Sequence, residues 1–111
     1  MLLFASCGQQ HDAEVLVKDF MKQYMKSDLA ITGRHFTHID STTLLSDSII
    51  NRLRLSAKNA LRYQRNIPYQ YGKATKPLYV VRVKYHIDTT AYSDTYYLNH
   101  ELTDIVAFKE N

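Results

Sequence analysis

Residues 79–88, with the sequence YVVRVKYHID, decide the fold class of this 111-residue chain. Every odd position in the stretch is apolar, and from Arg82 onward every even position is polar or charged. Side chains on a strand alternate between the two faces of a sheet. The pattern therefore predicts a strand with one buried face and one face in water.

Two further strands are predicted over residues 92–100 and 103–109. The connections are short, so all three strands are expected to be antiparallel neighbours. Matching of the apolar faces places Tyr85 opposite Tyr96, which leaves a four-residue loop over residues 89–92.

The second hairpin admits two registers. The preferred register places Tyr96 opposite Phe108, because this pairing buries the phenylalanine. A slip by one residue would bury Ile105 and Ala107 instead.

Two long helices are expected before these strands. Apolar residues recur at three- and four-residue spacing over residues 12–27, which predicts the first helix. The second is expected to begin near Ser46 and to end before Ile67, because a proline follows and disfavours helical geometry at the residue before it. Residues 28–45 are expected to be irregular.

These elements predict an α+β fold, with two long helices followed by a three- or four-stranded antiparallel sheet meander and the helices packed on one sheet face. Tyr69 and Tyr71 would belong to the optional fourth strand, at an edge. The order of elements over residues 11–109 resembles the cystatin-like and nuclear-transport-factor-like α+β folds. That resemblance implies a concave sheet face that can enclose a small apolar ligand.

The chain begins with an apolar run, MLLFAS, followed by its only cysteine, Cys7. This run resembles the end of a bacterial lipoprotein signal, in which small residues precede a cysteine that is lipidated and becomes the first mature residue. The resemblance implies that residues 1–6 are the remnant of a signal and residues 7–11 are the lipidated cysteine and a polar spacer. Residues 12–111 then form a single α+β domain.

A lipid on Cys7 would make a membrane the first partner of this protein. The location implied is the cell envelope, with the protein lipid-anchored on the periplasmic or surface face. Six residues before Cys7, none of them basic, are fewer than a complete signal contains. A start codon upstream of Met1 would account for the difference, and without a signal the location would be cytoplasmic.

Composition and motifs narrow the function classes. With 14 basic and 11 acidic residues, the net charge of +3 is too small to indicate a nucleic-acid partner. The sequence contains no dinucleotide fingerprint, phosphate loop, zinc-protease helix or nucleophile elbow. We therefore expect no cofactor and no enzymatic activity.

Tyrosines and histidines of the second half are the candidates for ligand or partner contact. Most of the nine tyrosines lie in residues 63–97, where their rings suit half-buried strand surfaces. The residues expected to make such contact are Tyr92, Tyr97, His86 and His100.

Two other groups of polar residues are weaker candidates. His35, His38 and Asp40 are side chains that can ligate zinc, but loop histidines are common and no further ligand is evident, so no metal site is expected.

Basic residues recur at intervals of four along the predicted second helix, at Arg54, Lys58 and Arg62, with Arg65 just beyond. They would form either a basic stripe for phosphate or lipid headgroups or an ordinary solvated helix face.

Two functions stay open on the sequence. The first is a non-enzymatic, membrane-anchored envelope lipoprotein whose body binds a protein or joins an assembly. The alternative is a small-molecule-binding or enzymatic cystatin-like cup domain that uses the concave sheet face. A closed helix–sheet interface would favour the first, and a pocket of roughly 300 Å³ or more with converging His86, His100 or Asp94 would favour the second.

Overall fold

The longest strand of the sheet is β3 (Leu78–Ile87), which pairs with three other strands. The computed structural model describes residues 2–69 and 77–111, with side chains described from Gly8 onward. The helices are α1 (Leu2–Tyr24) and α2 (Asp47–Ala57). The strands are β1 (Ile31–Phe36), β2 (Asp40–Thr42), β3 (Leu78–Ile87), β4 (Thr90–Leu98) and β5 (Ile105–Glu110).

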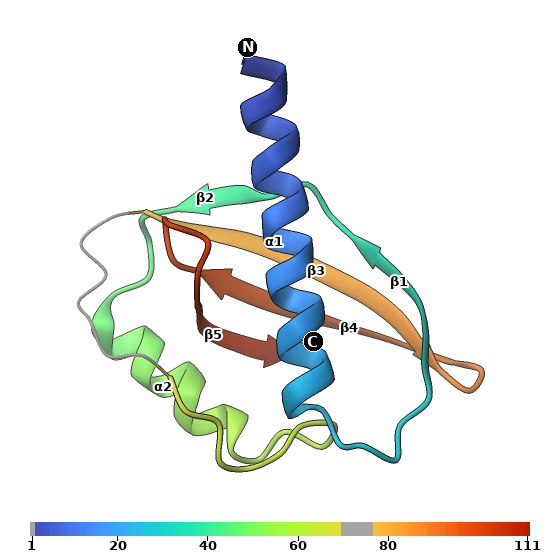
Figure 1. Cartoon of the computed structure of the whole chain (residues 1–111). Helices are drawn as coiled ribbons and strands as arrows, with labels where there is room; N and C mark the ends of the chain where they lie inside the picture. The colour runs from blue at the N-terminus through green and yellow to red at the C-terminus, as the bar shows by residue number, and fades with distance from the viewer. Residues whose placement is uncertain (1, 70–76) are drawn as a thin grey trace.

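The sheet is antiparallel throughout and has five strands (Figure 1). β4 and then β5 lie on one side of β3, while β1 and β2 follow one another along its other edge. The α+β class is confirmed, with both helices before β3, β4 and β5. The expectation that residues 28–45 are irregular is wrong, because β1 and β2 lie there. The middle four residues of β1 are exposed, so no apolar alternation marks this strand in the sequence.

The β3–β4 hairpin has a tighter turn than expected. Ile87 lies opposite Thr90, and Asp88 between them takes a left-handed backbone conformation with φ of 56°. Aspartate tolerates this conformation better than most residues. Tyr85 consequently faces Tyr92, four residues from the expected Tyr96. An even shift keeps each side chain on its predicted face, so the face assignment survives the error in register.

The β4–β5 hairpin combines parts of both expected registers. Tyr96 lies opposite Phe108 as preferred, but a bulge then places Leu98 opposite Ile105. The connection is organised by Asn99, whose side-chain oxygen accepts hydrogen bonds from the backbone N–H groups of Thr103 and Asp104. The bulge lets Ile105 and Phe108 share the buried face, which a regular ladder would not allow.

Helix α1 covers one face of the sheet. Its buried side chains pack against the apolar positions of β3, β4 and β5 in a single core cluster. Members of this cluster include Ala13, Val17, Met21, Val81, Val83, Tyr85, Tyr96, Leu98 and Phe108. The predicted buried face of β3 is therefore confirmed.

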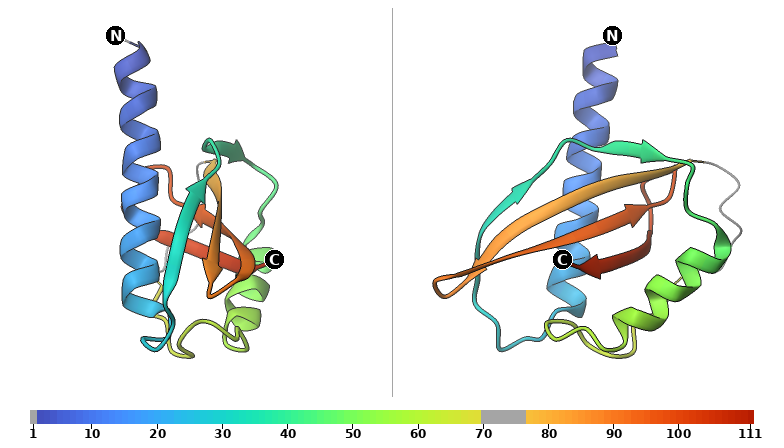
Figure 2. Two further views of the ribbon diagram at one scale, coloured as in Figure 1. Left: turned by 90° about the vertical axis from the view of Figure 1, so that its right-hand side faces the viewer. Right: turned by 180° about the vertical axis from the view of Figure 1, so that it is seen from behind.

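Helix α2 contacts the opposite face. Its buried Ile50 packs with Leu78 and Ala107, whose side chains point away from α1, in a second and smaller cluster. Figure 2 shows the sheet lying between the two helices. The expected packing of both helices on one face is thus not confirmed. The start of β3 has an apolar residue at an even position, Leu78, and α2 covers it.

Both helices differ in length from expectation. Helix α1 begins at Leu2, ahead of the predicted start at residue 12, so residues 7–11 are helical. Helix α2 begins after the N-cap Ser46, as predicted, but it ends at Ala57, well before Ile67. Tertiary contacts described below hold the chain after α2 in a non-helical path. Of the expected edge-strand residues, Tyr69 belongs to no strand and Tyr71 lies outside the described residues.

Candidate functional site

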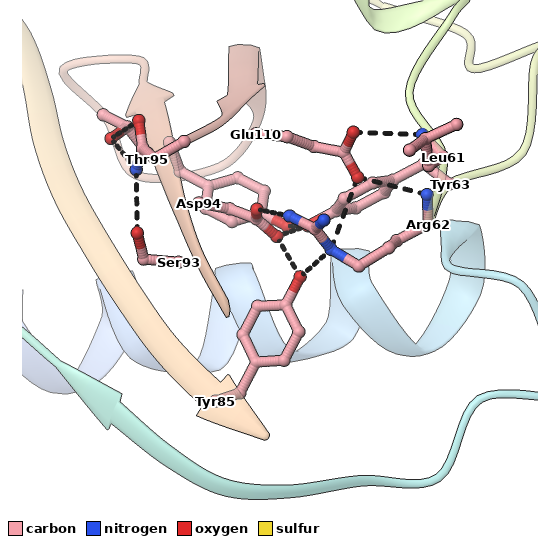
Figure 3. Close-up of polar contacts among 10 residues, drawn as sticks. Leu61, Arg62, Tyr63, Tyr85, Ser93, Asp94, Thr95 and Glu110 are labelled. Carbon is pink, nitrogen blue, oxygen red and sulfur yellow. Dashed lines mark hydrogen bonds and ion pairs between the residues drawn. The ribbon is translucent and has the colours of Figure 1, made fainter. Parts of the chain in front are cut away.

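A carboxylate lies at the centre of the interface between α1 and the sheet. Asp94 is fully buried on the apolar face of β4, opposite Val83. Its Oδ1 accepts a hydrogen bond from Nη2 of Arg62 at 2.6 Å (Figure 3). Its Oδ2 accepts from the hydroxyls of Tyr63 and Tyr85, each at 2.6 Å. A buried charge of this kind is tolerated only when it is paired and hydrogen-bonded, and here it is both.

Arg62 supplies the compensating charge from the chain that follows α2. Its Nε donates to the Tyr85 hydroxyl at 2.7 Å and lies 3.4 Å from a carboxylate oxygen of Glu110. The guanidinium carbon lies 4.3 Å from the ring centroid of Tyr92, at cation–π distance. Burial by itself lowers the pKa of Arg62, but the hydrogen bond with Tyr85 and the charge of Asp94 together raise that pKa above its ordinary value. The guanidinium is therefore permanently charged.

Tyrosine hydroxyls complete this network. Tyr63 and Tyr96 share a hydrogen bond in addition to the contact of Tyr63 with Asp94. Burial raises the pKa of Tyr63, Tyr85 and Tyr96 well above the ordinary value for tyrosine. All three hydroxyls stay protonated at physiological pH, and those of Tyr63 and Tyr85 each donate a hydrogen bond to Asp94.

Glu110 ties the backbone after α2 to the end of β5. Its two carboxylate oxygens accept hydrogen bonds from the backbone N–H groups of Leu61 and Arg62, at 3.0 and 3.1 Å. Tyr63 forms an isolated antiparallel bridge with Met25 beside these contacts. These bonds occupy N–H groups that a longer helix would use internally, which explains the early end of α2.

The network leaves no room for a substrate. Asp94 and Tyr96 have no exposed surface, and Tyr63 is only 1% exposed. Each polar side chain in it is bonded to another residue of the chain. We conclude that the helix–sheet interface is closed and that Asp94 and Arg62 hold the fold together.

The residues predicted to contact a ligand or partner do not converge. Tyr92 packs against Tyr85 and Arg62 on the α1 side of the sheet. Tyr97 points to the other face and packs in the cluster under α2. Both tyrosines are partly buried, so part of each side chain remains exposed.

The two histidines lie near opposite ends of β3. His86 is exposed and faces Ala91 on β4, whereas His100 stacks on Tyr79 with ring centroids 5.6 Å apart. Cys7 lies within α1, and its side chain is outside the described part of the structure.

The histidine-containing segment before α2 is extended. His35 belongs to β1, His38 follows it, and Asp40 begins β2, with all three exposed. Within residues 8–69 and 77–111, no group of three or more His, Cys, Asp or Glu side chains is placed to hold a metal ion.

A cleft of about 610 Å³ opens where this segment passes α1, and His11, Glu14 and His38 contribute to its walls. Gln10 of α1 bonds to the backbone of this segment. Its Nε2 donates to the carbonyl of Thr37 at 2.9 Å and its Oε1 accepts from the N–H of Ile39 at 2.8 Å. The side chain thus completes the backbone hydrogen bonding of the β1–β2 connection and fixes it to α1.

A second cleft, of about 860 Å³, lies between α2 and residues 65–69. Arg54, Lys58 and Arg65 line it, so three members of the predicted basic row do gather. The fourth, Arg62, is instead part of the buried network.

Sequence reasoning placed Asp94 on the buried face but did not find its partners. The available signal was a carboxylate among apolar residues of one strand face, which requires a buried cation. Arg62 is 32 positions away in the chain, and no local pattern connects the two residues.

Comparison with known proteins found no matching family model, no similar curated protein and no similar solved structure. Among the described residues, no helix combines the length and apolar character needed to cross a membrane. The function therefore has to be argued from the residues themselves.

Proposed function

We propose that this protein is a non-enzymatic, membrane-anchored lipoprotein of the cell envelope whose folded body binds a protein or contributes to an assembly. The observation that carries the proposal is the closed interface between α1 and the sheet. Asp94 was a candidate for catalysis or ligand binding in a cup domain, and its carboxylate is fully used by Arg62, Tyr63 and Tyr85. This arrangement counts against the alternative of a ligand cup and leaves the outer surface for function.

The anchor is supported by two features of the N-terminal region. Two small residues precede Cys7 at the end of an apolar run, as at the end of a lipoprotein signal. The first turns of α1 project beyond the sheet (Figure 1), and Gly8, Gln9, His11 and Asp12 are exposed. An attachment at Cys7 would precede Gln9 and Gln10, which bond to the body, and Ala13, the first buried apolar residue.

Fractionation of the protein in a bacterial host tests the anchor. The gene is expressed with its native upstream region, and membrane and soluble fractions are compared for the wild type, Cys7→Ala and Ser6→Ala. We expect the wild type and Ser6→Ala to remain with the membranes, because alanine keeps the small residue and the cysteine is intact. We expect Cys7→Ala to move to the soluble fraction. Equal partition of the wild type and Cys7→Ala would contradict the anchor.

A further inference from the structure

The cleft between α2 and residues 65–69 has a composition that indicates its ligand. Arg54 of α2, the C-cap Lys58 and Arg65 of the facing segment bring three cations to its walls. Among the described residues, no aspartate or glutamate lines the cleft. Three like charges in a concave site raise the local potential and attract an anionic partner.

One of these cations is held in place by the fold. Arg54 donates from Nε to the carbonyl of Val106 at 2.8 Å, and its guanidinium lies 4.8 Å from the ring centroid of Tyr69. The position of this charge is therefore fixed before any ligand arrives. Lys58 and Arg65 are exposed, so their side chains can adjust to a bound group. A fixed cation beside two adjustable ones suits a ligand with more than one negative charge.

The cleft also has an apolar component. Leu55 is 62% exposed, and Ile67 and Pro68 contribute to the lining. The hydroxyl of Tyr69, in the same wall, is buried and has no hydrogen-bond partner among the described residues. Burial raises the pKa of Tyr69 to about 12, against the opposing effect of Arg54, so the hydroxyl keeps its proton.

Two kinds of anionic ligand suit this cleft, the lipid headgroups of a membrane and a segment of a protein, and the position of the cleft distinguishes between them. In all three views α2 lies at the end of the molecule away from the N-terminus of α1 (Figures 1 and 2). A membrane that holds the N-terminus would therefore lie at the opposite end from the cleft. The lipid headgroups of that membrane are poorly placed as its ligand, and a second protein is well placed.

We propose that the cleft between α2 and residues 65–69 docks an acidic segment of a partner protein, in which carboxylates alternate with apolar side chains. Carboxylates of the segment contact Arg54, Lys58 and Arg65, and its apolar residues cover Leu55 and Ile67. The inference rests on the proposed function and assigns the chemical class of the partner.

A defined peptide tests this inference on the full chain. A fluorescein-labelled decapeptide of alternating glutamate and leucine is titrated with the protein and followed by fluorescence anisotropy, with a glutamine–leucine peptide as the uncharged control. The cleft variant is Lys58→Glu/Arg65→Glu, and the matched variant is Lys18→Glu/Lys22→Glu on α1, which has the same change in net charge on the other side of the sheet. All four lysine and arginine side chains are exposed, so both variants are expected to fold, as thermal unfolding will verify.

We expect the acidic peptide to bind the wild type and the uncharged peptide to bind much more weakly. The cleft variant should weaken binding by about tenfold or more, and the α1 variant by no more than about twofold. Backbone amide shifts of the ¹⁵N-labelled protein should be largest over residues 51–58 and 65–69. Failure of the acidic peptide to bind, or equal weakening in the two variants, would overturn the inference.

Vesicles of phosphatidylglycerol provide the remaining comparison. If the vesicles bind the wild type and the α1 variant but not the cleft variant, and the peptide does not bind, the cleft recognises a membrane surface and the inference is wrong. The outcome of these binding experiments does not depend on whether Cys7 carries a lipid. If the peptide docks but the fractionation test fails, only the proposed anchor is wrong. If the protein is lipidated but the peptide does not dock, only this inference is wrong.

Discussion

Replacement of Asp94 by asparagine removes the charge at the centre of the interface while keeping the size of the side chain. The carboxylate accepts three hydrogen bonds of 2.6 Å each, from Arg62, Tyr63 and Tyr85. An asparagine side chain has one oxygen acceptor in place of two, and its NH₂ group would face donors. Arg62 would lose its closest anion, and Glu110, at 3.4 Å, would remain.

The expected cost follows from the burial of this pair. Breaking a buried ion pair by removal of one partner destabilises a protein by about 3–5 kcal/mol. The total stability of a domain is typically about 5–15 kcal/mol, so Asp94→Asn should remove at least about a fifth of it, and most of it if the domain is at the low end of that range. Asp88→Asn is the matched control, because Asp88 is exposed and asparagine accepts the left-handed turn equally well. This control should change stability by less than about 0.5 kcal/mol.

Urea denaturation followed by circular dichroism and tyrosine fluorescence measures both variants. Arg62→Met and the double variant Arg62→Met/Asp94→Asn complete a double-mutant cycle. Because the two residues form one ion pair, the double variant should be less destabilised than the sum of the single variants, by about 1 kcal/mol or more. A cost below about 1 kcal/mol for Asp94→Asn, or additive single costs, would refute the buried pair as a main support of the interface.

Three further predictions concern the same fold. Val83→Asp should cost several kcal/mol because Val83 has no exposed surface, while Lys84→Asp on the exposed side should stay within about 0.5 kcal/mol, and equal losses in urea denaturation would contradict the assigned faces. Tyr63, Tyr85 and Tyr96 have raised pKa values, so in the folded state they keep protons that the unfolded chain loses above pH ~10. The free energy of unfolding should therefore hold below that pH. Above it, this free energy should fall by about 1.4 kcal/mol per pH unit for each tyrosine. Absorbance at 295 nm should then report these tyrosinates only as circular dichroism is lost, and their ionisation in a folded protein would argue against the closed interface. Gln10→Ala removes two hydrogen bonds to the β1–β2 connection and should cost about 1–2 kcal/mol in urea denaturation. Alanine favours a helix over glutamine, so propensity predicts no loss, and a similar cost for the exposed Gln9→Ala, which makes neither bond, would contradict this assignment.

The sequence predicted those parts of the fold that local periodicity determines. The alternation in residues 79–88 identified β3 and its buried face, and Ser46 marked the start of α2. The missed features depend on contacts between distant residues. The hairpin register depended on the conformation of Asp88, and the end of α2 depended on Glu110, about 50 positions further along the chain.

The candidate site was harder to predict than the fold for the same reason. No apolar pattern in the sequence places Tyr92 or Tyr97 in the core, and in the structure Tyr92 packs on Arg62 while Tyr97 packs in the cluster with α2. The basic row at intervals of four was a correct signal only in part. Arg54 lies on α2 and Lys58 is its C-cap, whereas Arg62 lies beyond the helix and enters the interface.

The intact mass of the protein isolated from the membranes of its native host tests the central claim most directly. We predict a mature chain that begins at Cys7, has lost residues 1–6 together with any preceding signal, and carries a diacylglyceryl group on its cysteine. An unmodified protein with an uncleaved N-terminus before Cys7 would contradict the proposed lipid anchor and, with it, the location in the cell envelope.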